Sequence, residues 1–330
     1  MPPAEVQPLN NGVGLLPAAR WQKVLFVLPA FLLTFFIVIF PTVFGILVSF
    51  TSWTRTGTTL DGPGSGFVLL RLGDMVGDIS DAIRGTWNGV NNFREMARDH
   101  AFRTALRNNL IFTFVGVPLQ YLVALGLALL LNQQIRARKF FRVVFLLPFM
   151  ISPIAVGWMI GKAMFDARFG PFAKLAREFD ITLRFFDSGF KAVFWLIMIN
   201  AWYAIPFVMI MLVAGLQAMP GEVFEAAKID GAGRWRTFAD MTFPLLLPVS
   251  LTAVVLRIIF EFKLVDIIYV VTGGGPGDAS QTLSLFVYKE GYLSGDIGYA
   301  TAVAEVFLII VIAVIVLLLV TIGRKIRSLV

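Results

Sequence analysis

The sequence contains no cysteine and a single histidine, His100. The absence of cysteine excludes disulfides, thiolate catalysis and cysteine-ligated metal ions. One histidine leaves almost nothing for a histidine metal site or for a serine–histidine–aspartate triad. The composition therefore argues against an enzyme, and we expect no catalytic residue, no metal ion and no cofactor on this chain.

Charged residues are also scarce. They make up 15% of the 330 residues, whereas 58% are hydrophobic and the mean hydropathy is +0.80. A soluble domain has about half apolar and about a quarter charged residues. The apolar excess indicates that lipid is the solvent of most of the chain. The net charge of +7 does not predict nucleic-acid binding, because the basic residues cluster beside apolar stretches.

Long apolar stretches recur along the chain. A helix that crosses a bilayer needs roughly 20 mostly apolar residues. Five stretches meet this condition, and a sixth meets it apart from four charged residues. The predicted spans are 24–50, 110–131, 143–161, 192–216, 248–271 and 300–322. The first is too long for a signal-peptide core and lacks a small-residue cleavage site, so we expect it to remain as an anchor.

Two segments fall outside this pattern. Residues 1–19 are rich in proline and asparagine and predict a disordered tail, and the glycine-rich residues 55–86 predict an irregular external insertion. We find no internal repeat. Residues 20–330 are therefore expected to form a single transmembrane domain.

Basic residues are distributed unevenly between the loops. They precede the first span, fill the loop after the second and follow the sixth: Arg20 and Lys23; Arg136, Arg138, Lys139 and Arg142; Arg324, Lys325 and Arg327. With six spans, all three segments lie on one side of the membrane. Because cytoplasmic loops carry the excess of lysine and arginine, both termini are predicted to be cytoplasmic.

The predicted cytoplasmic loop 217–244 has a distinctive spacing. Glu225-Ala226-Ala227 is followed after three residues by Gly231 and after nine more by Met241-Thr242-Phe243-Pro244. A short helix is expected over 223–230, with an acid in its first turn and a reversal that needs positive φ at Gly231. One interpretation is an ordinary solvated connector, and the other is a surface that binds a partner.

This spacing resembles the EAA signature of the permeases of binding-protein-dependent ABC importers, in which the last four residues are usually Ile-x-Leu-Pro. Further stretches resemble the carbohydrate branch of that family, especially its maltose-type first permease. They are residues 88–93, 146–148 with 151–153, 206–207, 215–220, and 272–277 with 282–284. The resemblance covers about residues 20–325 and leaves out the insertion at 55–86.

The resemblance implies an all-α membrane protein with six transmembrane helices of the type I ABC importer permease class and a cytoplasmic EAA coupling-helix loop. The implied function is the translocation pathway of an ATP-driven importer for a sugar or sugar-like solute, in the bacterial cytoplasmic (inner) membrane. The implied partners are a second permease in a heterodimer, an ATPase dimer that carries ATP and magnesium, and an extracytoplasmic solute-binding protein. The residues implied in ATPase coupling are Glu225, Ala226, Ala227, Asp230, Gly231 and Pro244.

The chain itself lacks a nucleotide site. The phosphate-binding pattern G-x-x-x-x-G-K-[ST] is absent, because the only Gly-Lys pair, Gly161-Lys162, is followed by Ala163. ATP hydrolysis is therefore expected on a separate chain. No nucleic-acid partner is expected, whereas membrane lipid is.

The span at 248–271 carries Arg257, Glu261, Lys263 and Asp266. Each such charge costs about 2.5–3.5 kcal/mol on insertion scales. On a continuous helix Arg257 and Glu261 share one face, and Lys263 and Asp266 share another. Two alternatives stay open: ion pairs that keep the span insertable, or contacts with the transported solute.

The resemblance to maltose-type permeases favours solute contacts for one of these pairs and for several residues of other spans. The candidate pathway residues are Phe149, Ser152, Asn200, Tyr203, Phe207, Arg257 and Glu261. Aromatic faces can stack on the C–H faces of a sugar, and polar groups can reach its hydroxyls. The alternative function is an ion-coupled secondary transporter, which would leave the spacing of the 217–244 loop unexplained. The sequence does not name the solute.

Overall fold

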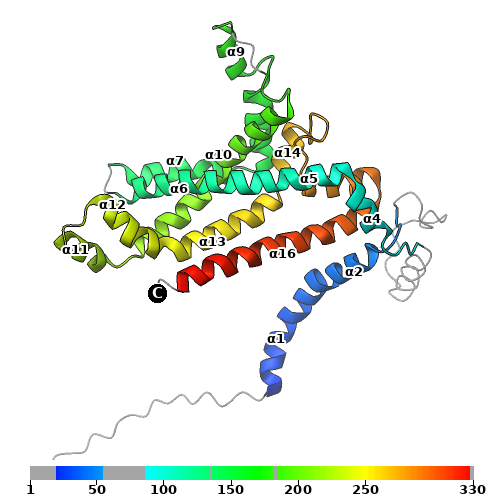
Figure 1. The fold of residues 1–330 in the computed structure, drawn as a ribbon, viewed down its shortest axis with the longest axis horizontal. Helices are drawn as coiled ribbons and strands as arrows, with labels where there is room; N and C mark the ends of the chain where they lie inside the picture. Colours follow the sequence, from blue (N-terminus) through cyan, green and yellow to red (C-terminus); the bar gives the residue numbers. More distant parts are fainter. Residues whose placement is uncertain (1–19, 55–85, 134–135, 181–183, 328–330) are drawn as a thin grey trace, which may run out of the picture. The chain divides into compact units, whose positions relative to one another are not determined.

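The computed structural model of the chain describes residues 20–54, 86–133, 136–180 and 184–327, without the side chains of 20–26 and 322–327 (Figure 1). The predicted tail and all but the last residue of the predicted insertion lie outside these ranges. The chain divides into two compact units, residues 1–47 and 48–330, and each is described by itself. The single domain expected from residue 20 onward therefore stays a prediction.

The first unit contains a helix with one π-helical turn. It consists of α1 (Arg20–Thr34), the π-helix η1 (Phe35–Ile39) and most of α2 (Phe40–Val48). Its segment Val27–Val48 is long and apolar enough to cross a membrane. Large apolar side chains along it are exposed, as expected where lipid replaces water.

The second unit begins with a short α4 (Asn91–Arg98) and a long helix. Asp99 caps that helix by accepting a 2.7 Å hydrogen bond from the backbone N–H of Ala101. The helix runs through α5 (His100–Ile111), the π-helix η2 (Phe112–Gly116) and α6 (Val117–Asn132). The span predicted at 110–131 is confirmed, and its helix begins ten residues earlier, at the cap.

The predicted third span is sharply bent. It consists of α7 (Arg138–Met150), followed by α8 (Pro153–Val156) and the π-helix η3 (Gly157–Met164), and its halves meet at 93°. Pro153 has no N–H to donate and disfavours helical backbone in the residue before it. Ile151 and Ser152 are accordingly extended, with ψ of 144° and 138°. The predicted span over 143–161 is therefore present as a bent pair of helices, broken at Ile151 and Ser152.

Helices account for most of the remaining described chain. In order they are α9 (Pro171–Arg177), α10 (Gly189–Gln217), α11 (Gly221–Ile229), α12 (Arg234–Thr237), η4 (Phe238–Thr242), α13 (Phe243–Phe262), α14 (Asp266–Val271), α15 (Leu283–Tyr288), η5 (Lys289–Ser294) and α16 (Ile297–Arg327). The described residues contain only two isolated β-bridges and no strand. The predicted all-α class is confirmed.

The helices long and apolar enough to cross a membrane agree with the predicted spans. Within the described ranges there are five, or six when the bent pair counts as one span. The fifth predicted span is longer than expected: α12, η4, α13 and α14 together cover Arg234–Val271. That span therefore extends directly out of the loop predicted to face the cytoplasm.

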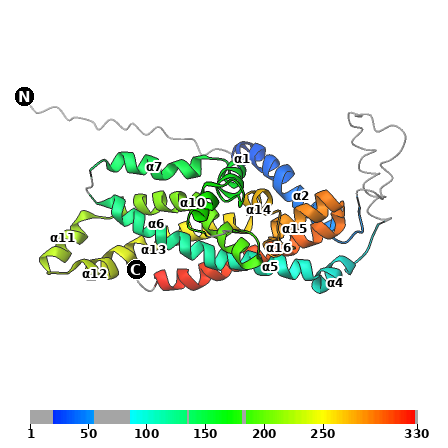
Figure 2. The ribbon, with the colours of Figure 1, turned by 90° about the horizontal axis from the view of Figure 1, so that it is seen from above.

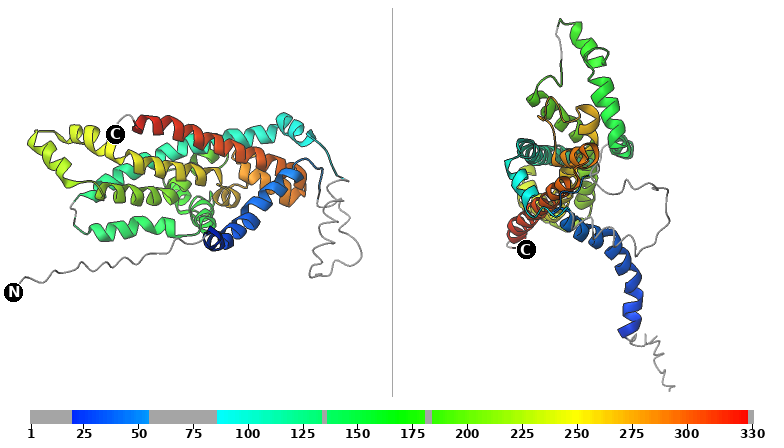
Figure 3. Two further views of the ribbon diagram at one scale, coloured as in Figure 1. Left: turned by 90° about the horizontal axis from the view of Figure 1, so that it is seen from below. Right: turned by 90° about the vertical axis from the view of Figure 1, so that its right-hand side faces the viewer.

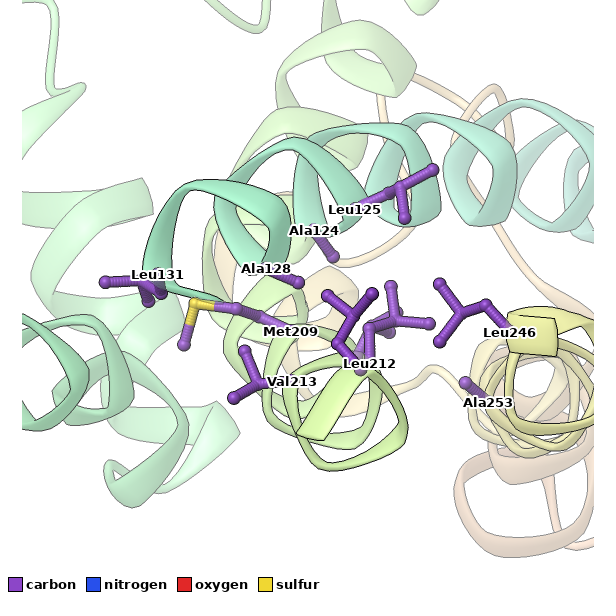
Figure 4. Close-up of a cluster of buried hydrophobic side chains, with 11 residues drawn as sticks. Ala124, Leu125, Ala128, Leu131, Met209, Leu212, Val213, Leu246 and Ala253 are labelled. Atoms are coloured by element: carbon purple, nitrogen blue, oxygen red, sulfur yellow. The ribbon is translucent and has the colours of Figure 1, made fainter. Parts of the chain in front are cut away.

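Helices α6, α10 and α13 form the largest hydrophobic core (Figures 2 and 4). Ala124 and Ala128 lie one turn apart on α6, are fully buried and point toward Met209 and Leu212 of α10. Small residues let helix backbones approach closely, which is how helices gain packing energy where the solvent is lipid. This α6–α10 seam fixes the two helices that flank the site.

The two ends of the second unit differ (Figures 1 and 3). One end carries α11, α12 and the C-terminal part of α16, and the other carries α4 and α15. The predicted cytoplasmic segments, residues 217–244 and the end of α16, thus share an end, as the distribution of basic residues requires.

Candidate functional site

A cavity of about 230 Å³ opens where α7, α8, α10, α13 and α14 meet. Aromatic, amide and charged side chains share its lining with a few aliphatic ones. The lining residues are Phe149, Pro153, Asn200, Tyr203, Arg257, Phe260, Lys263, Leu264, Asp266 and Ile267. A cavity of this mixed character within a helical membrane bundle is suited to a polar solute with apolar faces.

Two interruptions of helical backbone border the cavity. One separates α7 from α8 between Phe149 and Pro153, and the other separates α13 from α14 between Phe262 and Asp266. Irregular backbone at membrane depth is tolerated only where protein buries it or where it lines a polar cavity. Both interruptions thus point to the same location as the functional part of the bundle.

The second interruption is stabilised by the loop before α15. Thr282 donates a 2.9 Å hydrogen bond to the carbonyl of Leu264, and Ser284 donates one of 2.9 Å to the carbonyl of Phe262. Asn109 of α5 also donates to Phe262, at 3.3 Å, and accepts a 2.6 Å bond from the N–H of Leu283. The two carbonyl groups that lose their helical hydrogen bonds at the break therefore accept bonds from side chains and do not remain unpaired.

A closed polar network lies behind one wall of the cavity. Arg257 forms an ion pair with Glu261, one turn later on α13, and donates a 2.8 Å hydrogen bond to Gln120 of α6. Glu261 also accepts hydrogen bonds from Asn200 at 2.7 Å and from Gln120 at 3.4 Å. Glu261 is 0% exposed and Arg257 is 4% exposed. The charges neutralise each other where neither could remain alone.

Aromatic rings form one side of the cavity. The ring of Phe149 lies 5.6 Å from that of Tyr203 and 5.3 Å from that of Phe207. Phe207 in turn lies 5.8 Å from Phe260, nearly edge-on. Phe149 and Phe260 are 37% and 46% exposed, so part of each ring remains free to contact a ligand.

The structure brings together most of the predicted pathway residues. Phe149, Asn200, Tyr203 and Arg257 line the cavity. The other three predicted residues do not line it: Phe207 packs behind the ring of Phe149, Glu261 is fully buried beside Arg257, and Ser152 is exposed at the start of α8. Contact between these residues and a solute stays a prediction.

Three polar residues of the site were not among the predicted pathway residues. Gln120 was missed although an amide within an apolar span is itself a signal. Lys263 and Asp266 were expected to share a helical face, and this expectation was wrong, because the helix stops between them. Both instead line the cavity beside the break.

The 217–244 loop forms a compact turn between two helices. Helix α11 begins at Gly221 with Glu222 in its first turn, and Gly231 has φ of +70°. The backbone N–H of Ala232 donates a 2.9 Å hydrogen bond to the carbonyl of Ala227, which closes the helix end. The predicted short helix and the positive φ are both confirmed.

The predicted coupling residues differ in exposure. Glu225, Ala226, Asp230 and Gly231 are exposed, whereas Ala227 is only 2% exposed. Pro244 lies in the first turn of α13, directly after the π-helical turn η4, and has no N–H to donate to it. Of the two alanines only Ala226 can present a flat patch to a partner. Ala227 instead faces the inside of the loop, beside a pocket that Asp230 and Arg236 also line.

Two large apolar side chains project from this loop. Ile229 at the end of α11 and Trp235 in α12 are 86% and 83% exposed. They flank the turn at Gly231, at the end of the unit where α11 and α12 lie (Figure 1). Exposed apolar groups beside a rigid turn are typical of a protein interface.

The described residues hold no group of three or more histidine, cysteine, aspartate or glutamate side chains placed to bind a metal ion. The only carboxylate of the polar network, Glu261, is fully buried and already paired. Within the described residues the candidate site therefore consists of the cavity and the exposed 217–244 loop.

Comparison with known proteins agrees with this geometry. A family model described as binding-protein-dependent transport system inner membrane component matches residues 116–327. The chain is 31% identical to the trehalose/maltose transport system permease protein MalF of Thermococcus litoralis, over 68% of this chain and 76% of that protein. It is 33% identical to the sn-glycerol-3-phosphate transport system permease protein UgpA of Agrobacterium fabrum, over 68% and 77%.

A third relative and a solved structure extend the coverage. The chain is 30% identical to a probable ABC transporter permease of Pyrococcus horikoshii, over 88% of this chain and 92% of that protein. The crystal structure of a bacterial alginate ABC transporter, in complex with a periplasmic protein bound to an alginate pentasaccharide, matches with a TM-score of 0.72 and 17% identity. That match covers 93% of this chain and 96% of the other, and it shows the fold.

The match of the family model covers most of the second unit, including every helix that lines the cavity and the whole 217–244 loop. The resemblance inferred from the spacing of Glu225, Gly231 and Pro244 is thereby confirmed. The chain belongs to the family of binding-protein-dependent transport system inner membrane components, and is a permease subunit of an ABC-type import system.

Proposed function

We propose that this permease forms the translocation pathway for a sugar or sugar-like solute, meaning a sugar, an oligosaccharide, a polyol or a sugar phosphate. The observation that carries the proposal is the cavity between the two interrupted spans, with aromatic rings on one side and charged groups on the other. Its relatives include permeases of transport systems for trehalose/maltose and for sn-glycerol-3-phosphate.

The lining suits such a solute chemically. The rings of Phe149 and Tyr203 can stack on the C–H faces of a sugar. Asn200 and Asp266 can hydrogen-bond its hydroxyl groups. Arg257 already has an acidic partner, whereas Lys263 is exposed and has no ion-pair partner within 4.0 Å among the described residues. Lys263 is therefore the cation available to an anionic group of the solute.

A separate ATPase dimer, with ATP and magnesium, would supply the energy through the 217–244 loop. Glu225 is exposed and can accept a charge-assisted hydrogen bond from an ATPase arginine. Ile229 and Trp235 would enter apolar parts of the same interface. The helical run from Arg234 to Phe262 starts in this loop with Trp235 and ends at the cavity, where Lys263 follows it directly. Movement of the loop would therefore tilt the cavity wall.

The remaining assembly follows from the family and from the distribution of charge. A second permease would complete the pathway in a heterodimer, and an extracytoplasmic solute-binding protein would deliver the solute. Both termini would be cytoplasmic, because the basic segments at 136–142 and 324–327 belong on that side of the bacterial inner membrane.

Reconstituted complexes test the coupling part. Glu225→Lys should leave the assembled permease in the membrane and abolish solute-dependent ATP hydrolysis, because a like charge then faces the ATPase arginine. Glu222→Lys, in the first turn of the same helix, is the matched control. Transport and ATPase rates equal to wild type in Glu225→Lys would contradict the role of the loop.

A further inference from the structure

The cytoplasmic ends of α7 and α10 carry a basic cluster that the proposed transport mechanism does not use. Arg138 and Arg142, one turn apart on α7, both direct a guanidinium nitrogen at the side-chain amide of Gln217, the last residue of α10, and the amide oxygen accepts from both when the amide is oriented to suit its neighbours. The Nε atoms of both arginines are buried and have no hydrogen-bond partner within the described ranges. Two guanidinium groups thus converge on one neutral acceptor.

No acidic side chain on the adjoining helices neutralises this cluster. The sequence has no aspartate or glutamate between Asp99 and Asp166, a stretch that includes α6 and α7, and none from Gly189 to Gln217 in α10. Helix α7, which carries the two arginines, contacts both α10 and α6, and neither arginine forms an ion pair within 4.0 Å among the described residues. Converging cations without a carboxylate leave the cluster short of an anion.

Helices α7 and α10 lie side by side (Figure 2), and residues of both line an apolar cavity of about 120 Å³ beside the cluster. Arg142 and Gln217 provide its polar part. The rest of its lining is aliphatic or thioether, from Leu146, Met209, Ile210, Val213 and Ala214. The flank of α7 is also apolar and exposed, with Val143 at 59% and Leu147 at 51%.

We propose that this site binds an anionic phospholipid, with its phosphate between Arg138 and Arg142 and an acyl chain in the cavity below. The basic cluster complements the anionic headgroup of such a lipid, and the apolar cavity beside it complements an acyl chain. Basic pockets between transmembrane helices on the cytoplasmic side are where anionic headgroups bind, and that leaflet carries the anionic lipids. A bound lipid would replace Gln217 as the acceptor and hold the end of α7 against α10.

The test uses the assembled transporter in nanodiscs of phosphatidylglycerol and phosphatidylcholine, followed by native mass spectrometry of the lipids that stay bound. Arg138→Gln/Arg142→Gln should lower the preference for phosphatidylglycerol by about 100-fold or more, because it removes two charge-assisted hydrogen bonds, each worth roughly a factor of ten, in addition to the general attraction of basic groups near the surface. A control pair of exposed basic residues should lose only that general attraction, roughly a factor of five for each residue. The matched control is Arg136→Gln/Lys139→Gln, which removes the same charge from exposed positions of the same segment.

A second variant tests the apolar cavity without changing the charge of the protein. Ala214 is exposed and lines the cavity, so Ala214→Trp fills it without disturbing the buried core, and retention of phosphatidylglycerol should fall although both arginines remain. An equal loss from both arginine-region double variants would overturn the proposal, because charge alone would then explain binding. Unchanged lipid retention with loss of the ATPase from Arg138→Gln/Arg142→Gln would also overturn it and assign the arginines to a protein carboxylate.

Discussion

The α6–α10 seam and the cavity wall belong to the same helix bundle but differ in residue composition and in the continuity of their helices. In the seam, small apolar residues such as Ala124 and Ala128 bring two unbroken helices together. Around the cavity, the helices are interrupted and a buried arginine and glutamate lie in the wall. In lipid, polar groups and free carbonyls are costly unless each has a partner. The comparison indicates that, within one unit, the apolar seam holds the helices together whereas the polar, interrupted segments form the candidate site.

The largest expected effect on stability comes from removing one charge of the buried polar network. Glu261→Ala leaves Arg257 buried without its partner and should destabilise the subunit by about 3–5 kcal/mol. The thermal midpoint of the detergent-solubilised complex measures this loss. The double variant Arg257→Met/Glu261→Met should regain most of it, because the remaining partners are neutral amides. Equal instability of the single and double variants would show that packing, and not charge, matters here.

A smaller loss is expected from overfilling the seam. Ala128→Leu adds bulk where Ala128 is fully buried against α10, and should cost about 1–3 kcal/mol. Gly126→Leu adds slightly more bulk to the same helix where a new Cβ meets nothing within 4 Å, and it should be neutral or slightly stabilising. The comparison uses the same thermal assay. A midpoint for Ala128→Leu as high as that of Gly126→Leu would argue against close packing at the seam.

Removing one donor at the helix break should have a modest effect. Thr282→Val leaves the carbonyl of Leu264 without its side-chain donor and should cost about 1–2 kcal/mol. Thr252→Val is the control, because that hydroxyl bonds an exposed carbonyl of its own helix at 3.0 Å. Hydrogen exchange at 264–268 should rise in Thr282→Val only. Unchanged exchange there would show that the break does not depend on the loop.

Substitution of Lys263 should have the smallest effect on stability. Its effect on transport should nevertheless be clear. Because this side chain is exposed, Lys263→Gln should change stability by less than about 0.5 kcal/mol. Uptake of a phosphorylated or acidic solute should fall, while uptake of a neutral sugar should persist. Uptake assays in proteoliposomes with both kinds of solute measure this. Loss of neutral-sugar uptake as well would assign Lys263 a structural role.

The sequence predicted the parts of the fold that depend on local composition and backbone chemistry. Apolar length located the spans, Pro153 marks the bend, and Gly231 marks the turn of the 217–244 loop. The spacing within this one short segment was enough to indicate the family. The bend itself, at 93°, was not predicted, since a proline only removes helical bonds and the neighbouring helices decide the direction of the chain.

Only the tertiary structure decided how the polar residues are paired. The break between Phe262 and Asp266 contains neither proline nor glycine, and Thr282, Ser284 and Asn109 stabilise it from distant parts of the chain. Gln120 joins the polar network from 137 residues away. Local sequence determines where a helix can form, because the relevant contacts are within a turn or two. The partner of a buried polar group is set by packing between helices, which no local pattern records.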